Sequence, residues 1–142
     1  MSEESKTADP VQLTRLAVEA GSRRDWSAAA SFYAPDAVWD MSAIGVGKFE
    51  GTRAIRSFWE DWVSAYEGFA AETGEILHFG DGVVLVVVRM QGRMTGAGGP
   101  VEQHTAWIYE WAEGTVLRVT IYLDIDEARA AAERLTKERA DG

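Results

Sequence analysis

The stretch spanning residues 83–124 constrains the fold of this chain more than any other. It is rich in valine, isoleucine, threonine, tryptophan and tyrosine, and the turn sequences GAGGP and AEG divide it into three parts. This composition is typical of three consecutive strands. In the runs VVLVVV and TIYLDI, apolar side chains occupy both sets of alternating positions, which indicates a sheet with two buried faces. We expect helices of this chain to cover one face and a second copy of the chain to cover the other.

Two helices are predicted near the N-terminus. Asp9 and Pro10 suit the N-cap and first turn of a helix that ends at Gly21. The apolar face of this helix comprises Leu13, Leu16, Ala17 and Ala20. Asp25 suits the N-cap of a short second helix in the run WSAAASFY, which the sequence Ala-Pro-Asp at residues 34–36 ends.

A third predicted helix has the clearest periodicity in the sequence. Thr52 suits its N-cap and Gly68 its end. Its apolar residues recur at i, i+3, i+4, i+7, i+8 and i+11 and form one broad stripe. The stripe comprises Ile55, Phe58, Trp59, Trp62, Val63 and Tyr66.

Two more strands and a last helix complete the prediction. The strands cover residues 37–41 and 70–79, and the second joins the next strand through a Gly-Asp-Gly turn. Asp124 or Asp126 caps the last helix, whose apolar side comprises Ala128, Ala132 and Leu135. Helices at one end and strands at the other predict an α+β fold with an antiparallel sheet over helices. We expect one domain over residues 9–138, after a disordered tail over residues 1–8.

Composition restricts the classes of partner. The 142 residues fit one domain, and 23 acidic against 14 basic residues give a net charge of −9 without a basic cluster. We therefore expect neither nucleic acid nor an anionic membrane surface as a partner. The chain has no cysteine and its two histidines have no metal-ligand spacing, so we expect no metal and no cofactor. A polar, acidic N-terminus and the absence of a long apolar run favour a cytoplasmic location.

Two segments carry a resemblance to a known family. The run DWSAAASFYAPDAVWDMSAIGVGKFEGTRAIRSFWEDW resembles the N-terminal half of the SnoaL-like group in the nuclear transport factor 2 superfamily. Its markers are an acidic residue and an aromatic before a short helix, then Asp-Ala-Val-aromatic, then Gly-x-x-Ala-Ile before the long helix. The run VEQHTAWIYEWAEGTVLRVTIYLDIDEARAAAERL is similar to the C-terminal half, with an acidic-Gly turn, a Tyr-x-Asp strand end and an alanine-rich helix. The resemblance covers roughly residues 10–136.

The resemblance implies a fold more specifically than a reaction. It implies a curved antiparallel sheet wrapped around three N-terminal helices, which form a cone with a deep pocket and assemble as a homodimer through the outer sheet face. The superfamily includes ketosteroid isomerases, polyketide cyclases, limonene-epoxide hydrolases, dehydratases and domains without catalysis. The chemistry therefore has to be argued from the residues of the site.

The positions at which these enzymes keep their catalytic groups are apolar in this chain. By spacing, the isomerases' first carboxylate falls at Met41, their second acid near Trp107 and their tyrosine near Ala17. The aspartate that cyclases and epoxide hydrolases place on the last strand falls at Ile121. The resemblance therefore implies the pocket without its usual acids.

The alternation of side chains predicts which residues face this pocket. A strand turns successive side chains to opposite faces, so a slip of one residue would exchange the two faces. The predicted ligand-binding residues are Trp39, Met41, Trp62, Val86, Val88, Met90, Trp107, Tyr109, Val119 and Ile121. The same alternation places Arg89, His104, Arg118, Thr120, Tyr122 and Asp124 on the outer face.

Three polar residues are candidates for catalysis. Asp40 could act as a general base if the apolar pocket raised its pKa, but it also suits a strand-end cap or an arginine partner. His104 could transfer a proton, or it could be structural on an interface strand. Tyr33 could donate a hydrogen bond into the pocket, or it could belong to the core.

Three functions remain open at this point. The first is a SnoaL-like protein whose apolar pocket binds a small, cyclic hydrophobic molecule. The second is a proton-transfer enzyme of the isomerase, polyketide cyclase, dehydratase or epoxide hydrolase type. The third is a non-catalytic domain for dimerisation or interaction.

Overall fold

The described part of the chain has an α+β fold, as the sequence predicts. The computed structural model describes residues 9–94 and 100–141, so the predicted tail over residues 1–8 lies outside it. Helices α2 (Pro10–Ser22) and α3 (Trp26–Ala30) come first, α4 (Thr52–Ser64) follows the first two strands, and α5 (Ile125–Asp141) comes last. The strands are β1 (Tyr33–Asp40), β2 (Lys48–Glu50), β3 (Tyr66–Gly80), β4 (Val83–Met94), β5 (Pro100–Ala112) and β6 (Thr115–Tyr122), with a short 3-10 turn, Ser42–Ile44, between β1 and β2.

The described strands form one six-stranded sheet in the order β2-β1-β6-β5-β4-β3. Neighbouring strands are antiparallel, as expected, except that β1 runs parallel to β6 with Trp39 opposite Val119. The parallel pair joins β1, which precedes α4 in the chain, to the last strand β6. It brings the N-terminal strand onto the same sheet as the three consecutive strands that organise the chain.

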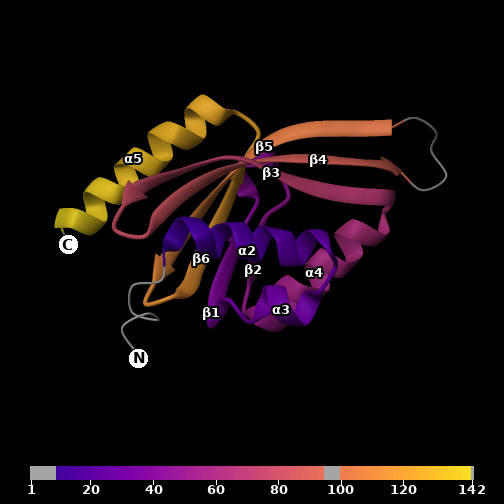
Figure 1. The fold of residues 1–142 in the computed structure, drawn as a ribbon, viewed down its shortest axis with the longest axis horizontal. Coiled ribbons are helices and arrows are strands. Elements are labelled where there is room, and N and C mark those ends of the chain that lie inside the picture. The colour runs from indigo at the N-terminus through magenta and orange to yellow at the C-terminus, as the bar shows by residue number, and fades with distance from the viewer. Residues whose placement is uncertain (1–8, 95–99, 142) are drawn as a thin grey trace.

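Helices cover both faces of the sheet. Figure 1 shows α2, α3 and α4 on one face and α5 on the other. The inner face packs its valines and aromatic side chains against the three N-terminal helices. On the outer face, Val83, Leu85, Ala106 and Ile108 pack against the alanines of α5. The expectation that a second copy covers the outer face is therefore wrong where α5 lies, because there a helix of the same chain covers the sheet.

Several element boundaries differ from the predicted ones. The second helix ends at Ala30, and β1 begins at Tyr33, well before the predicted strand at residue 37. Pro35 is tolerated inside this strand because the ladder to β6 shifts register between Tyr33 and Val38, so its missing N–H removes no ladder bond. The third helix ends at Ser64 instead of Gly68, and its predicted last apolar residue, Tyr66, begins β3.

Helix ends and faces also differ in detail. Leu16 was expected on the buried face of the first helix but is 42% exposed, whereas Thr14 is fully buried. Thr14 tolerates burial because its hydroxyl donates to the Pro10 carbonyl and accepts from Trp111 Nε1. Asp124 caps α5, since its carboxylate accepts from the Glu127 N–H at 3.0 Å. None of the helices in the described residues has the length and hydropathy needed to cross a membrane.

Candidate ligand cavity

A cavity lies between the three N-terminal helices and the inner face of the sheet. The centre of a water-sized sphere can occupy about 50 Å³ of it. One buried water needs about 10–15 Å³ by this measure, so the cavity has room for roughly three to five water-sized groups. The lining residues are Ala17, Val18, Gly21, Trp26, Ala29, Tyr33, Trp39, Trp59, Trp62, Val63, Phe69, Ala71, Trp107 and Tyr109.

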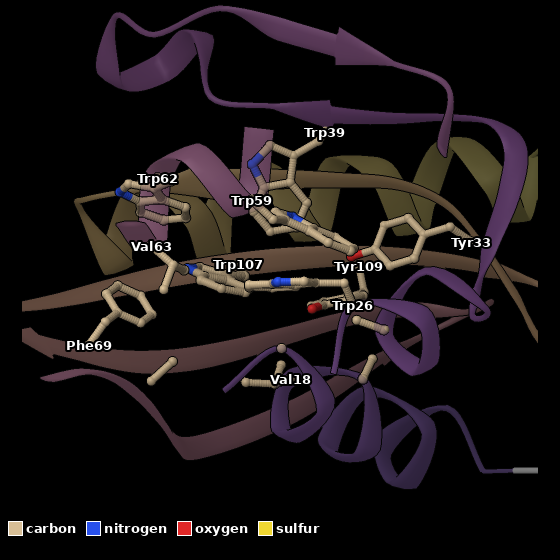
Figure 2. Close-up of a pocket in the computed structure, with 14 residues that line it drawn as sticks. Val18, Trp26, Tyr33, Trp39, Trp59, Trp62, Val63, Phe69, Trp107 and Tyr109 are labelled. Atoms are coloured by element: carbon tan, nitrogen blue, oxygen red, sulfur yellow. The ribbon is translucent and has the colours of Figure 1, made fainter. Parts of the chain in front are cut away.

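Aromatic rings form most of the cavity wall, and they hold one another in place. Trp39 contacts Trp59 and Trp107 edge-to-face, with ring centroids 5.5 and 5.3 Å apart. Tyr33 contacts Trp59 in the same manner at 5.2 Å. Edge-to-face contacts of this kind are favourable beyond the area that they bury. The wall is therefore preorganised by ring packing among residues of β1, α4 and β5 (Figure 2).

Few polar groups reach the cavity. Tyr33 and Tyr109 hydrogen-bond to each other through their hydroxyls, and burial raises the pKa of both phenols, so both are neutral at physiological pH. The indole nitrogen of Trp39 is buried without a hydrogen-bond partner. No described lining residue carries a charged side chain. The cavity therefore offers a ligand aromatic surface and a phenol pair.

One wall tryptophan has its donor already satisfied. Trp107 Nε1 donates to the hydroxyl of Thr105 at 2.8 Å, and that hydroxyl donates to the Val88 carbonyl at 3.1 Å. Thr105 is fully buried. This short chain of hydrogen bonds fixes the orientation of the Trp107 ring, which leaves the ring and not its N–H as the group offered to a ligand.

Four of the ten predicted ligand-binding residues line this cavity, together with the catalytic candidate Tyr33. Tyr33, Trp39, Trp62, Trp107 and Tyr109 do so. Met41, Val86, Val88, Val119 and Ile121 lie in the same inner core but do not reach the cavity. Alternation along a strand predicts the face on which a side chain lies, but not the depth at which the helices close over it. Met90 instead lines a second, smaller cavity.

Asp40 lies outside the cavity, in a groove between the outer sheet face and α5. Its carboxylate accepts from the Ser42 N–H at 2.9 Å and the Ser42 hydroxyl at 2.6 Å, and it forms an ion pair with Arg118. Burial by itself would raise the pKa of the Asp40 carboxyl. The hydrogen bonds from Ser42 and Arg118 outweigh burial and hold that pKa below its usual value. The geometry is that of a structural carboxylate and not of a base beside a ligand.

His104 also lies away from the cavity. It is exposed on the outer face of β5, opposite Arg89 on β4. The Arg89 guanidinium forms ion pairs with Glu72 and, at 3.2 Å, with Glu102. Among the described residues, no cluster of histidine, aspartate and glutamate could hold a metal ion.

Of the lining residues that the helices and β3 contribute, sequence reasoning predicted only Trp62. Trp59 belongs to the apolar stripe predicted for the third helix but was not predicted to contact a ligand. Trp62, one turn later, was predicted to face the pocket and does so. Trp26 and Val18 carried only the weak signal of helical spacing. Phe69 carried none, because it lies in an irregular part of β3 where the ladder to β4 shifts register.

A second cavity adjoins the first. Its volume by the same measure is about 30 Å³. Trp62 and Phe69 line both cavities. The remaining residues of the second cavity are Tyr66, Met90, Gln91, Gly92, Val101 and Gln103. The second cavity is therefore more polar than the first.

Comparisons with known proteins agree on the fold. The family model described as the SnoaL-like domain matches residues 14–119. A protein of ketosteroid isomerase-like fold from Catenulispora acidiphila, solved in complex with trimethylamine, superposes with a TM-score of 0.71 at 17% identity over 78% of this chain and 84% of that one. No curated protein matches the sequence.

Two further solved structures are similar. TerC, co-crystallised with polyporic acid, has a TM-score of 0.70 at 17% identity over 87% of this chain and 98% of that one. A protein from Sinorhizobium meliloti that carries the provisional name of polyketide cyclase has a TM-score of 0.65 at 26% identity, over 78% of this chain and 93% of that one. The three structures share the fold with this chain.

Proposed function

The chain belongs to the SnoaL-like domain family, and we propose that it binds a small, mostly apolar molecule in the aromatic cavity without acid–base catalysis. One observation carries the proposal. The cavity wall is aromatic and uncharged, while Asp40 and His104 lie on the other side of the sheet. A ligand in this cavity meets ring surfaces and not a proton-transfer group.

The cavity volume limits the size of this ligand. A dry cavity of about 150 Å³ binds benzene in another protein, three times the space found here. A single ring therefore requires some movement of the wall, whereas a molecule the size of trimethylamine requires little. The relatives support a small-molecule ligand, since one was solved with trimethylamine and another with polyporic acid.

The cavity suits two kinds of small ligand. Aromatic ring faces attract a methylated ammonium group, and the net charge of −9 favours cations over anions near the protein. The hydroxyl pair of Tyr33 and Tyr109 suits a ligand with a hydrogen-bond acceptor, such as a carbonyl oxygen. A proton-transfer enzyme is less well supported, because the described lining residues include no carboxylate and no imidazole.

Titration calorimetry with trimethylamine, phenol and cyclohexanone tests the proposal. A tiny ligand gains at most about 1.5 kcal/mol per heavy atom, so we expect dissociation constants from about tens of micromolar to millimolar. If none of these three probes bound to the protein, that result would contradict the proposal.

Gly21 provides a matched pair of variants for locating the binding. It lines the cavity, and a Cβ added to it would meet nothing within 4 Å. Gly21→Leu would therefore fill part of the space, and we expect it to weaken binding by about tenfold or more, with Gly21→Ala nearer to the original affinity. Equal affinity in all three proteins would place the bound probe elsewhere.

Homodimerisation through the remaining outer face and a cytoplasmic location stay predictions. The outer face beyond α5 carries charged and polar side chains, including Arg89 and its two glutamate partners. Sedimentation at micromolar concentration tests the dimer, and a monomer at that concentration would contradict it.

A further inference from the structure

We infer that Phe69, together with Trp62, is a movable partition between the two cavities and sets the length of ligand that the protein accepts. When the partition moves together with the wall around it, the cavities join and admit a longer aromatic molecule whose polar end contacts Gln103. This inference rests on the proposed function, because it specifies the ligand of the same cavity.

The partition is visible in the lining of the two cavities. Trp62 and Phe69 are the residues common to both, and their ring centroids lie 6.0 Å apart. Figure 2 shows both side chains at one end of the first cavity, with Tyr33 at the other end. Both residues are only partly buried. Their rings can therefore turn without opening the fully buried core beneath them.

The backbone at Phe69 explains how it reaches the cavity. The register of β3 against β4 shifts between Glu67 and Ala70, so neither Gly68 nor Phe69 has a partner across the ladder. Gly68 has a φ of 65°, which glycine adopts without strain. A bulge of this kind bends a strand and re-aims a side chain, and bulges are frequent beside functional sites. Fewer ladder bonds also make this part of β3 easier to move.

Gly92 on β4 allows the bulge to lie close to the sheet. A Cβ at this position would lie 3.3 Å from both Phe69 Cα and Tyr66 Cβ. The absence of a side chain at Gly92 lets this part of β3 approach β4 closely. Phe69 therefore sits where it does because of a bulge on its own strand and a glycine on the next.

Gln103 supplies the polar end of the joined space. It lies opposite Met90 in the ladder and has the same parity along β5 as Thr105 and Trp107, so it is on the inner face. Side chains along this face change from buried Trp107 to exposed Gln103 toward the second cavity. A two-ring molecule with a hydroxyl or carbonyl group would place its apolar end among the tryptophans and its polar end at the Gln103 amide.

The test compares a one-ring probe with a two-ring probe by titration calorimetry. The probes are phenol and 4-phenylphenol, and the variants are Phe69→Ala and the milder Phe69→Leu, which keeps more of the packing if the alanine variant folds poorly. We expect Phe69→Ala to raise the ratio of 4-phenylphenol affinity to phenol affinity by about tenfold or more relative to the original protein. Phe49→Ala is the matched control, because Phe49 stacks on Phe58 at 4.2 Å and lines neither cavity.

A second variant tests the polar contact. Adding Gln103→Leu to Phe69→Ala should lower the affinity for 4-phenylphenol by about fivefold or more. The affinity for unsubstituted biphenyl should stay nearly unchanged, because biphenyl makes no hydrogen bond. An equal change in affinity for 4-phenylphenol and biphenyl would contradict the role of Gln103.

The outcomes separate this inference from the function on which it rests. If phenol binds the original protein and neither Phe69 variant favours 4-phenylphenol, the partition is wrong and the proposed function stands. If no probe binds the original protein or any variant, the proposed function fails and the partition with it. If Phe49→Ala gained as much affinity for 4-phenylphenol as Phe69→Ala, the inference would also be contradicted. The gain would then come from a general loosening of core packing and not from the partition.

Discussion

Trp39 and Asp40 are neighbours in β1 whose side chains lie on opposite faces of the sheet. Trp39 lines the cavity, whereas Asp40 pairs with Arg118 in the groove beneath α5. The alternation of a single residue thus separates the carboxylate from the ligand space. In a chain with this register, the acid holds the loop after β1 in place through Ser42.

Asp40→Asn should lower stability without changing ligand affinity. The substitution weakens the hydrogen bonds from Ser42 and removes the ion pair with Arg118, and we expect a loss of about 1–3 kcal/mol. The midpoint of denaturant unfolding measures the loss, and calorimetry with phenol measures the affinity. A variant of unchanged stability whose affinity falls more than about tenfold would contradict the structural role and favour a role in the cavity.

The pH dependence of unfolding should report the same carboxylate. Hydrogen bonds from Ser42 and Arg118 hold the pKa of Asp40 below its ordinary value in the folded protein, so its contribution to stability is present above the unfolded pKa and is lost as pH falls through the folded one. Stability should therefore drop more steeply below about pH 4 in the original protein than in Asp40→Asn. Identical acid slopes for the two proteins would show that Asp40 has no shifted pKa.

Glu110 should show the opposite behaviour. Burial raises its pKa, with Glu138 adding to that rise and Arg118 and Arg139 opposing it. A raised folded pKa gives a contribution that is present below the unfolded pKa and is lost as pH rises through the folded one. Glu110→Gln should therefore be more stable than the original protein at neutral pH, by up to about 1 kcal/mol. Thermal unfolding at pH 4 and pH 7 measures it, and a destabilised variant at pH 7 would contradict the prediction.

Thr14→Val should destabilise the protein by leaving a buried donor unpaired. Trp111 Nε1 donates to the Thr14 hydroxyl at 2.9 Å, and Thr14 is fully buried. Valine has nearly the same shape but no acceptor, so the cost should be about 1–3 kcal/mol. Thr14→Ser keeps the hydroxyl and should recover part of the loss in the same denaturant experiment. Equal stability of the valine and serine variants would show that the hydrogen bond contributes nothing.

The fold could be predicted from the sequence because apolar residues recur periodically along its helices and strands. The stripe from Ile55 to Val63 and the alternating residues of the three consecutive strands each identify a buried face, and the resemblance to SnoaL-like proteins arranges those faces into one fold. The cavity was predicted only in part. Trp39 and Trp107 follow from alternation, but Phe69 depends on a bulge that no periodicity marks.

The outer face could not be predicted correctly from the strands alone. Their apolar outer residues indicate that something covers them but not what does so. The alanines of α5 are small enough to lie close to Leu85 and Ile108, and an amphipathic terminal helix can reach either face. Parity also left open whether Asp40 enters the pocket, because a slip of one residue in the register would exchange the two faces of the strand.

Gly92→Ala should disturb both stability and the choice of ligand. An added methyl group in a strand interior normally stabilises by about 0.5–1 kcal/mol relative to glycine. Here the new Cβ would lie 3.3 Å from Phe69 Cα and Tyr66 Cβ, atoms that cannot move without their backbone. We expect the steric strain to outweigh this stabilisation, with a net loss of about 1–2 kcal/mol in the free energy of unfolding.

The displaced bulge should also shift the Phe69 ring and change the ratio of 4-phenylphenol to phenol affinity. Gly21→Ala is the control, because its added Cβ meets nothing within 4 Å. Since Gly21 lies in α2, this variant should keep or raise stability, and it should keep the affinity ratio. A Gly92→Ala protein that is as stable as the original, with the same affinity ratio, would show that the close approach of β3 to β4 has no part in positioning Phe69.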